Sequence, residues 1–222
     1  MDAETIPAAD YEQDGGAKRR QVMEGARTVF LSQGFDGASM NDIARAAGVS
    51  KGTLYVYFES KEQLFEALIR ESRKEQAERL VFPDDPGDAR ELLRGFGRRL
   101  IELMTRPETI AYVRIVIAAT GKFPRLGQAF YEAGPCHGVR NLAAQLVKLC
   151  DSGALEIEDA ERAAQQFIDL CKSGVLNPVL FGMTETADPR QIEVAVDAGV
   201  EVFMRAYATQ GVSPRPGVTE GR

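Results

Sequence analysis

The sequence predicts an all-α fold. Apolar residues recur at intervals of three and four through most of the chain, which is the spacing of one helix face. Serine or aspartate precedes several of these stretches, where it can cap a helix, and no alternating strand pattern of useful length is present. We expect an acidic disordered tail over residues 1–17, a small domain of short helices over 18–64, a larger helical domain over 65–210, and a disordered tail over 211–222.

Four helices are expected before residue 80. Serine should cap three of them, because its hydroxyl can accept a hydrogen bond from a free N–H of the first turn. Glycine should end two of them, because it adopts the left-handed backbone that terminates many helices. The expected caps are Ser39, Ser50 and Ser60, and the expected ends are Gly34 and Gly48. The fourth helix, over about 61–80, should connect the small domain to the larger one.

The larger domain should contain five further helical segments, over about 89–104, 107–120, 124–150, 158–181 and 189–209. The β-branched run at 113–117 also suits a strand, but the chain offers no partner strand, so a buried helix is the better interpretation. Gly134-Pro135 should break or kink the segment that contains it.

Composition limits the class of protein. The 222 residues are 44% hydrophobic and 27% charged, as in an ordinary globular protein. No apolar run reaches the roughly 18 residues of a membrane helix, and the acidic N-terminus lacks the features of a signal peptide. We therefore expect a cytoplasmic protein with no membrane partner.

Metal and catalytic chemistry are not expected either. His137 is the only histidine, which is too few for a usual zinc site or for most Ser-His and Cys-His catalysis. Cys136, Cys150 and Cys171 form no disulfide framework. They are expected to be small buried side chains, with a redox switch at Cys136 as the alternative. We expect no cofactor and no enzymatic activity.

The segment from 39 to 61 has the pattern of a helix-turn-helix that holds DNA. The turn at Gly48 joins two short helices, and small alanines let them approach closely. The second of these is too short to be a good core element, but it can offer its N-terminus to a major groove. Its lysine, hydroxyl and tyrosine groups can bind phosphates, and its glycine lets backbone approach the bases. The candidate DNA contacts are Ser50, Lys51, Gly52, Thr53, Tyr55, Tyr57 and Lys61.

The charge distribution agrees with this interpretation. The net charge is −6, but residues 18–58 hold six basic side chains against three acidic ones, whereas 1–17 hold five acidic side chains and no basic one. A basic lobe on an acidic body is compatible with DNA contact.

A longer pattern surrounds the helix-turn-helix. The stretch "VFLSQGFDGASMNDIARAAGVSKGTLYVYFESKEQLFEALI" resembles the DNA-binding domain of TetR/AcrR-family regulators. The matching marks are Gly34-Phe35, the capped "SMNDIARAAGVSKGTLY", Phe58, and Ser60-Lys61-Glu62 before Leu64-Phe65. Residues 112–182, with "FPRLGQAFYEAGP" and "AAQQFIDLCKSGVLNPVLFG", resemble the ligand-binding domain of the AefR-like branch.

The resemblance implies roles for particular residues. Asn41, Lys51 and Gly52 would face base edges, and Ser39, Thr53, Tyr55, Tyr57 and Lys61 would face phosphates. Val56 departs from the aromatic or polar residue that relatives often carry, which leaves the role of that position open. The implied function is a homodimeric repressor that binds a palindromic operator in double-stranded DNA and is released by a small, mostly apolar effector. The alternative is a DNA-bound adaptor whose helical body recruits a protein.

Two residue sets in the larger domain fit these roles. A two-fold dimer could form through small and apolar stripes of the last two helices, although each stripe could instead face the core. The candidate dimer residues are Ala164, Phe167, Ile192, Ala195, Val196, Gly199, Val202 and Phe203. The candidate ligand-binding residues are Phe96, Leu100, Met104, Tyr112, Val116, Phe123, Phe130, Tyr131, His137, Phe167 and Cys171. A ligand that prefers another conformation of the larger domain would rotate the fourth helix. The two DNA-binding domains of the dimer would then no longer match the operator.

Overall fold

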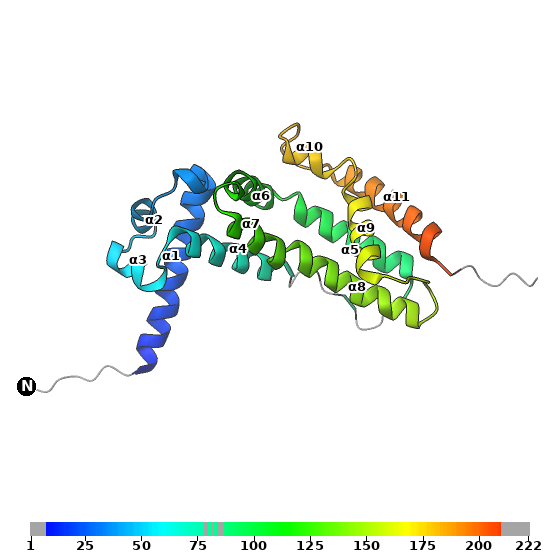
Figure 1. Cartoon of the computed structure of the whole chain (residues 1–222), viewed down its shortest axis with the longest axis horizontal. Helices are drawn as coiled ribbons and strands as arrows, with labels where there is room; N and C mark the ends of the chain where they lie inside the picture. Colours follow the sequence, from blue (N-terminus) through cyan, green and yellow to red (C-terminus); the bar gives the residue numbers. More distant parts are fainter. Residues whose placement is uncertain (1–7, 78–79, 81, 84–86, 210–222) are drawn as a thin grey trace, which may run out of the picture. The chain divides into compact units, whose positions relative to one another are not determined.

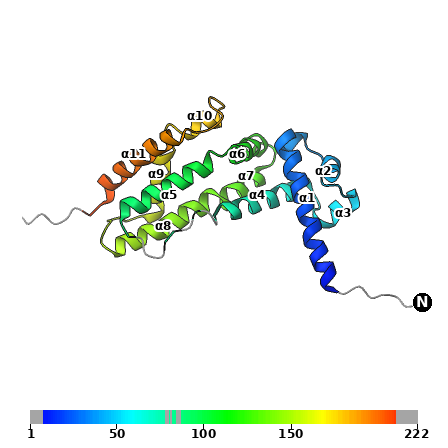
Figure 2. The same cartoon turned by 180° about the vertical axis from the view of Figure 1, so that it is seen from behind.

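The structure is a computed structural model, and it describes residues 8–77, 80, 82–83 and 87–209. Within those residues every regular element is a helix, and the single β feature is an isolated bridge between Leu155 and Ala208 (Figures 1 and 2). The all-α prediction is therefore confirmed. The chain divides into two compact units: unit 1 contains residues up to 79 together with 104–137, and unit 2 contains 80–103 together with the residues from 138 onward.

Unit 1 is built around an aromatic core. It contains helices α1 (Ala8–Gly37), α2 (Met40–Ala46), α3 (Lys51–Tyr57), α4 (Lys61–Ala77), α6 (Pro107–Thr120) and α7 (Pro124–Ala133). Phe30 and Phe35 of α1 pack against Phe65 of α4, with ring centroids 4.9 and 5.3 Å away. Phe123, in the turn between α6 and α7, meets the Phe35 ring at 4.9 Å. These contacts join the helix-turn-helix region to α6 and α7, so the compact unit extends past the boundary expected at residue 64.

The start of α1 differs from the prediction. The helix begins at Ala8, whereas residues 8–17 were expected to belong to a disordered tail. Alanine favours a helix, and acidic residues near the N-terminus stabilise the helix dipole. Gly34 has φ +71°, which interrupts the helix where the sequence predicted its end. The tail predicted over 211–222 lies outside the described residues.

The predicted serine caps are present. Ser39 accepts a hydrogen bond from the Asp42 amide, and Ser50 accepts one from the Thr53 amide. Ser60 accepts from the Gln63 amide, and the Gln63 side chain accepts from the Glu59 amide, which completes a capping box one residue away from the usual pairing.

Unit 2 is built from α5 (Ala89–Met104) up to residue 103, most of α8 (Pro135–Asp151), α9 (Ala160–Lys172), α10 (Leu176–Leu180) and α11 (Pro189–Tyr207). Arg90, Arg94 and Arg98 of α5 form ion pairs with Glu201, Asp197 and Glu193 of α11. Beneath these pairs, the Cys171 sulfur lies where side chains on Gly97 and Gly199 would be, 3.2 Å from either ideal Cβ position. Three helices therefore approach closely around one thiol.

The helix predicted over 158–181 was wrong in its middle. It divides into α9 and α10 at Ser173–Val175, where Gly174 has φ +75°. The predicted break at Gly134-Pro135 is present, because α7 ends at Ala133 and α8 begins at Pro135.

Candidate nucleic-acid interface

The turn between α2 and α3 is fixed by its glycine and by a small core. Gly48 has φ +63°, and the Val49 amide donates to the Ala44 carbonyl at 3.0 Å. Ile43 and Leu54, one from each helix, are fully buried. The predicted packing of the two short helices is therefore present, and α3 cannot rotate without opening this core.

Helix α1 supports the same turn from behind. Gly25 of α1 lies so close to Ala47 that an added Cβ would be 2.6 Å from the Ala47 Cβ. Beside it, the Gln21 side chain donates a hydrogen bond of 2.6 Å to the Ala47 carbonyl. Figures 1 and 2 both show α2 and α3 on one side of α1. The short helices are thus held against a long helix by close packing and a hydrogen bond.

The outward face of α3 carries the residues that the sequence singled out. Lys51, Gly52 and Tyr55 are exposed, and the Lys51 ammonium lies 5.9 Å from the centre of the Tyr55 ring. An added Cβ at Gly52 would meet only the Ser50 hydroxyl, at an ordinary contact distance of 3.7 Å. The interior of the protein therefore gives no reason for glycine at this position, and a reason must come from whatever approaches α3 from outside.

The hydroxyl groups are less available than the sequence suggested. Ser39 and Ser50 use their oxygens as helix caps, and the hydroxyls of Ser50 and Thr53 lie 2.8 Å apart. Tyr57 is half-buried and packs against the core of unit 1. Asn41 is exposed at the start of α2. The structure thus places Asn41, Lys51, Gly52 and Tyr55 at the surface.

Lys61 occupies an internal position. Its ammonium donates hydrogen bonds to the carbonyls of Phe35 at 2.7 Å and Ala38 at 3.0 Å. It also lies 4.5 Å from the centre of the Phe35 ring. The lysine therefore ties the start of α4 to the end of α1, a contact that the sequence pattern did not reveal.

Val56 is the exposed residue of α3 that the candidate set omitted. Its side chain is 79% exposed, among the most exposed of the large apolar side chains in the described part of the chain. It lies one turn after Gly52, on the same face of the helix. A helical-wheel comparison with the buried Leu54 could have identified it from the sequence.

The candidate ligand-binding residues divide between the two units. In unit 1, Tyr112 and Val116 are buried in the aromatic core, while Tyr131 and His137 are exposed. Phe130 lies under the Arg73 guanidinium, 4.1 Å from ring centre to Cζ, and burial lowers the pKa of Arg73 to about 10. Met104 and Phe123 are half-buried in the same unit.

In unit 2 the candidate ligand-binding residues are packed together. The rings of Phe96 and Phe167 lie 6.5 Å apart, and Phe167 in turn meets Phe203 at 5.3 Å. Leu100 is buried, and burial raises the pKa of the Cys171 thiol to about 12. The structure thus places Phe96, Leu100, Phe167 and Cys171, the four candidate ligand-binding residues of unit 2, in the core of that unit.

The candidate dimer residues lie on two different faces of α11. Ile192, Val196, Gly199 and Phe203 are buried, as are Ala164 and Phe167 of α9, so most of the set packs inside unit 2. Ala195 and Val202 instead line an open groove of about 580 Å³ on the outer side of α9 and α11, and the buried Gly199 forms part of its floor. Val194 and Ala198, which the sequence analysis missed, line the same groove. A second hollow, which extends toward the C-terminal end of α11, shares Leu170, Ser173 and Val202 with this groove. The groove therefore continues along both helices.

The described residues contain neither a metal-binding cluster nor a membrane-spanning helix. No cluster of three or more His, Cys, Asp or Glu side chains there could hold a metal ion. Among the same residues, no helix combines the length and apolar character needed to cross a bilayer.

Family models match both parts of the chain. Residues 22–68 match the model for bacterial regulatory proteins of the tetR family, and 91–209 match the C-terminal domain of AefR-like transcriptional repressors. Among solved structures, the flavonoid-responsive regulator FrrA is 36% identical with a TM-score of 0.78, covering 88% of this chain and all of FrrA. A TetR-family regulator from Mesorhizobium loti MAFF303099 is 27% identical with the same TM-score, covering 87% of this chain and 98% of the other.

Curated relatives match over a shorter region. The repressor AcnR of Corynebacterium glutamicum is 40% identical over 60 residues, which are 27% of this chain and 32% of AcnR. The repressor KstR2 of Rhodococcus jostii is 35% identical over 66 residues, which are 30% of this chain and 32% of KstR2. The matches thus span about a third of these relatives. With one model covering more than half of the sequence, the chain belongs to the TetR family of bacterial transcriptional regulators and carries the AefR-like form of the C-terminal domain.

Proposed function

We propose that this regulator is a homodimeric repressor, working in the cytoplasm, that reads a palindromic operator and leaves it when a small molecule binds. The observation that carries the proposal is the outer face of α3. Lys51 supplies a positive charge and Tyr55 supplies a hydroxyl. Gly52 leaves room for DNA to approach the helix backbone, although the packing inside the protein does not require a glycine there. A short helix that exposes these groups suits a major groove.

Val56 belongs to the same reading face. A valine that is 79% exposed has no polar group to offer, but it can contact the 5-methyl group of thymine in the major groove. Lys51 can donate to a guanine or a phosphate. We therefore expect each half-site to contain a thymine opposite Val56.

A single α3 buries too little surface to bind tightly, so two copies are needed. The groove on the outer side of α9 and α11 supports a dimer. Besides Asp188, Arg190 and Gln191, its lining residues are small or apolar, which lets another helix pair approach closely. The lining residues with small side chains are Ser173, Gly174, Ala195, Ala198 and Gly199. Two readers about 34–36 Å apart would then enter successive major grooves.

The effector is proposed to be a small aromatic compound. FrrA, which is similar along its whole length, is described as flavonoid-responsive. Both units of this chain contain aromatic clusters that include predicted ligand-binding residues, with Phe123 in one and Phe96 in the other. Aromatic and apolar side chains are the ones that contact a ligand of that class, which would enter by displacing part of this packing.

The test begins with DNA. Fragments of the source genome are incubated with the protein, retained fragments are sequenced, and the affinity for the best one is measured by fluorescence anisotropy. A palindromic site whose binding is lost in Tyr55→Ala supports the proposal. Failure to enrich any sequence, or binding unchanged by Tyr55→Ala, contradicts it.

Dimerisation and release are tested separately. Ala198→Glu, in the groove, should shift the protein to monomers in sedimentation equilibrium and weaken operator binding. Ala144→Glu, at an exposed alanine of α8, is the matched control and should do neither. A panel of flavonoids is then titrated into the complex of protein and operator, where a fall in anisotropy identifies an effector.

A further inference from the structure

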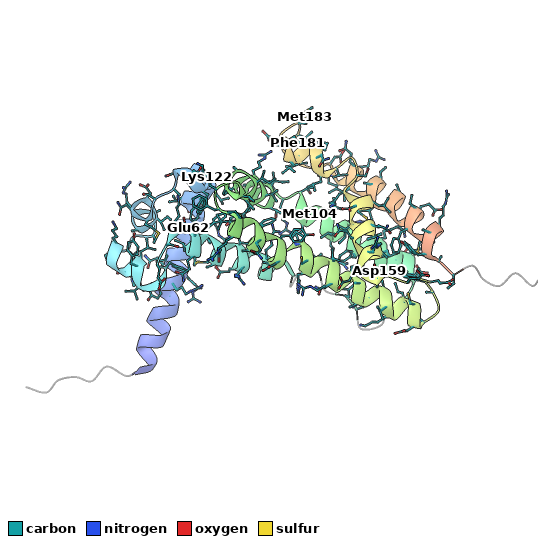
Figure 3. All side chains as sticks on the ribbon, viewed as in Figure 1. Glu62, Met104, Lys122, Asp159, Phe181 and Met183 are labelled. Carbon is teal, nitrogen blue, oxygen red and sulfur yellow. The ribbon has the colours of Figure 1, made fainter. Side chains whose placement is uncertain are left out.

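The turn that follows α10 presents two large apolar side chains to solvent. Phe181 is 78% exposed and Met183 is 79% exposed, on either side of Gly182. Figure 3 shows both side chains at this turn. We call residues 181–183 the tip.

The backbone of the tip is fixed by hydrogen bonds. Gly182 has φ +75°, its amide donates to the Val179 carbonyl at 3.1 Å, and the Met183 amide donates to the Pro178 carbonyl at 2.8 Å. This is the Schellman pattern of a helix end. In that pattern the residue at the Met183 position often packs back on its own helix, but Met183 points outward instead. The exposure of both side chains is therefore a property of an ordered turn.

The tip adjoins, along the chain, the two segments that line the groove proposed as the dimer surface. The residues that line the groove come from 170–175, at the end of α9 and just after it, and from 188–202, which begin at the cap of α11. The tip lies between these two segments in the chain. In the described part of unit 2, the large apolar side chains that are clearly exposed are Val147, Phe181, Met183, Val194 and Val202. All except Val147 belong to the tip or to the outer face of α11.

We propose that the tip is covered by a second copy of this chain, so that Phe181 and Met183 anchor the dimer beside the α9–α11 groove. The inference rests on the proposed dimer. A second copy is the occupant because the exposed large apolar side chains in the described part of unit 2 are concentrated on the tip and on the outer face of α11, and a two-fold interface pairs such a surface with itself. Aromatic and methionine side chains are enriched in such interfaces.

The chain contains no tryptophan, which provides a direct probe. In Phe181→Trp the indole is the sole tryptophan, and its emission reports whether the tip is in water. The full-length variant is diluted through the monomer–dimer transition, which sedimentation equilibrium locates independently. Emission that shifts to the blue and resists iodide quenching as dimers form supports the inference. Emission that stays solvent-exposed in the dimer overturns it, and leaves the dimer proposal standing.

A second measurement removes the anchor. Phe181→Ser combined with Met183→Ser should raise the dimer dissociation constant by about tenfold or more, with circular dichroism unchanged. Val147→Ser, 48% exposed on α8, is the matched control and should leave the constant unchanged. Equal effects of the two changes, or no effect of the double variant, would overturn the inference. If the unaltered protein sediments as a monomer at every concentration, both the inference and the proposed dimer fail.

Discussion

The Lys61 ammonium caps the end of α1, with its nitrogen 2.7 Å from the Phe35 carbonyl oxygen and 4.5 Å from the centre of the Phe35 ring. The next residue, Asp36, pairs with Lys122 at 2.6 Å, which lowers the pKa of the Asp36 carboxyl. The end of α1 is thus held both by α4 and by the turn between α6 and α7. A movement of α4 or of the α6–α7 turn would therefore be transmitted to α2 and α3 through the end of α1.

Lys61→Met separates an internal role from a phosphate contact. We expect a loss of about 1–3 kcal/mol in unfolding free energy, because two charge-assisted hydrogen bonds disappear. Operator affinity should fall, but the slope of log affinity against log salt should stay the same, since no phosphate contact is lost. Lys51→Met, at an exposed lysine, should reduce that slope by about one unit per subunit without changing stability. A reduced slope in Lys61→Met at unchanged stability would assign Lys61 to the phosphates.

Two glycine-to-alanine variants distinguish reading from folding. Gly52→Ala should leave stability unchanged or raise it by up to about 1 kcal/mol, because alanine favours a helix and the protein leaves room for the methyl group. The same methyl group should weaken operator binding about tenfold or more. Gly25→Ala should instead destabilise the fold by about 1–3 kcal/mol, because its methyl group overlaps Ala47. Thermal unfolding and anisotropy measure the two effects, and full operator affinity in Gly52→Ala would contradict the close approach.

Val56 is tested by changing the DNA and the protein together. Replacing the thymine opposite Val56 with deoxyuridine removes only a methyl group, and affinity should fall severalfold. In Val56→Ala the same replacement should have little effect, because the contact has already been lost. Additive losses in the four anisotropy titrations would show that Val56 and the methyl group do not meet.

Cys171 should be chemically silent at neutral pH. Burial raises the pKa of its thiol to about 12, so the reactive thiolate is scarce in the folded protein. A thiol reagent at pH 8 should label the half-buried Cys136 and Cys150 first, and Cys171 only after unfolding. Because the raised pKa favours the neutral thiol, this group stabilises the fold fully below its unfolded pKa of about 8.5 and progressively less as pH rises toward 12. Mass spectrometry of labelled peptides gives the order, and early labelling of Cys171 would contradict it.

Local chemistry made part of the structure predictable. Ser39, Ser50 and Ser60 could be predicted as caps because each serine hydroxyl accepts a hydrogen bond from an amide only three residues later in the sequence. The break at Gly174 was missed because apolar spacing continued across it, and a lone glycine inside a helical pattern does not by itself indicate a positive φ.

Contacts between residues far apart in the sequence could not be predicted from local patterns. The hydrogen bond from Lys61 to the Phe35 carbonyl could not be predicted, because folding brings together two residues that are 26 positions apart. The sequence predicts an apolar stripe on α11 but not what covers it. In the structure most of that stripe is buried inside unit 2, while Val194 and Ala198 line the outer groove. An apolar pattern identifies a helix face that is buried. It does not show whether that face packs against the same chain or against another one.

The ion pairs between α5 and α11 have a further consequence. Arg90, Arg94 and Arg98 are spaced by four residues, as are Glu201, Asp197 and Glu193, which run in the opposite direction. A slide of one helical turn, about 5.4 Å, would re-form two of the three pairs. Charge therefore sets the direction of the two helices but tolerates more than one alignment. The alignment is chosen by Gly97, Gly199 and the sulfur of Cys171 between them, so enlarging either glycine should let the helices settle one turn away with most of their charges still matched.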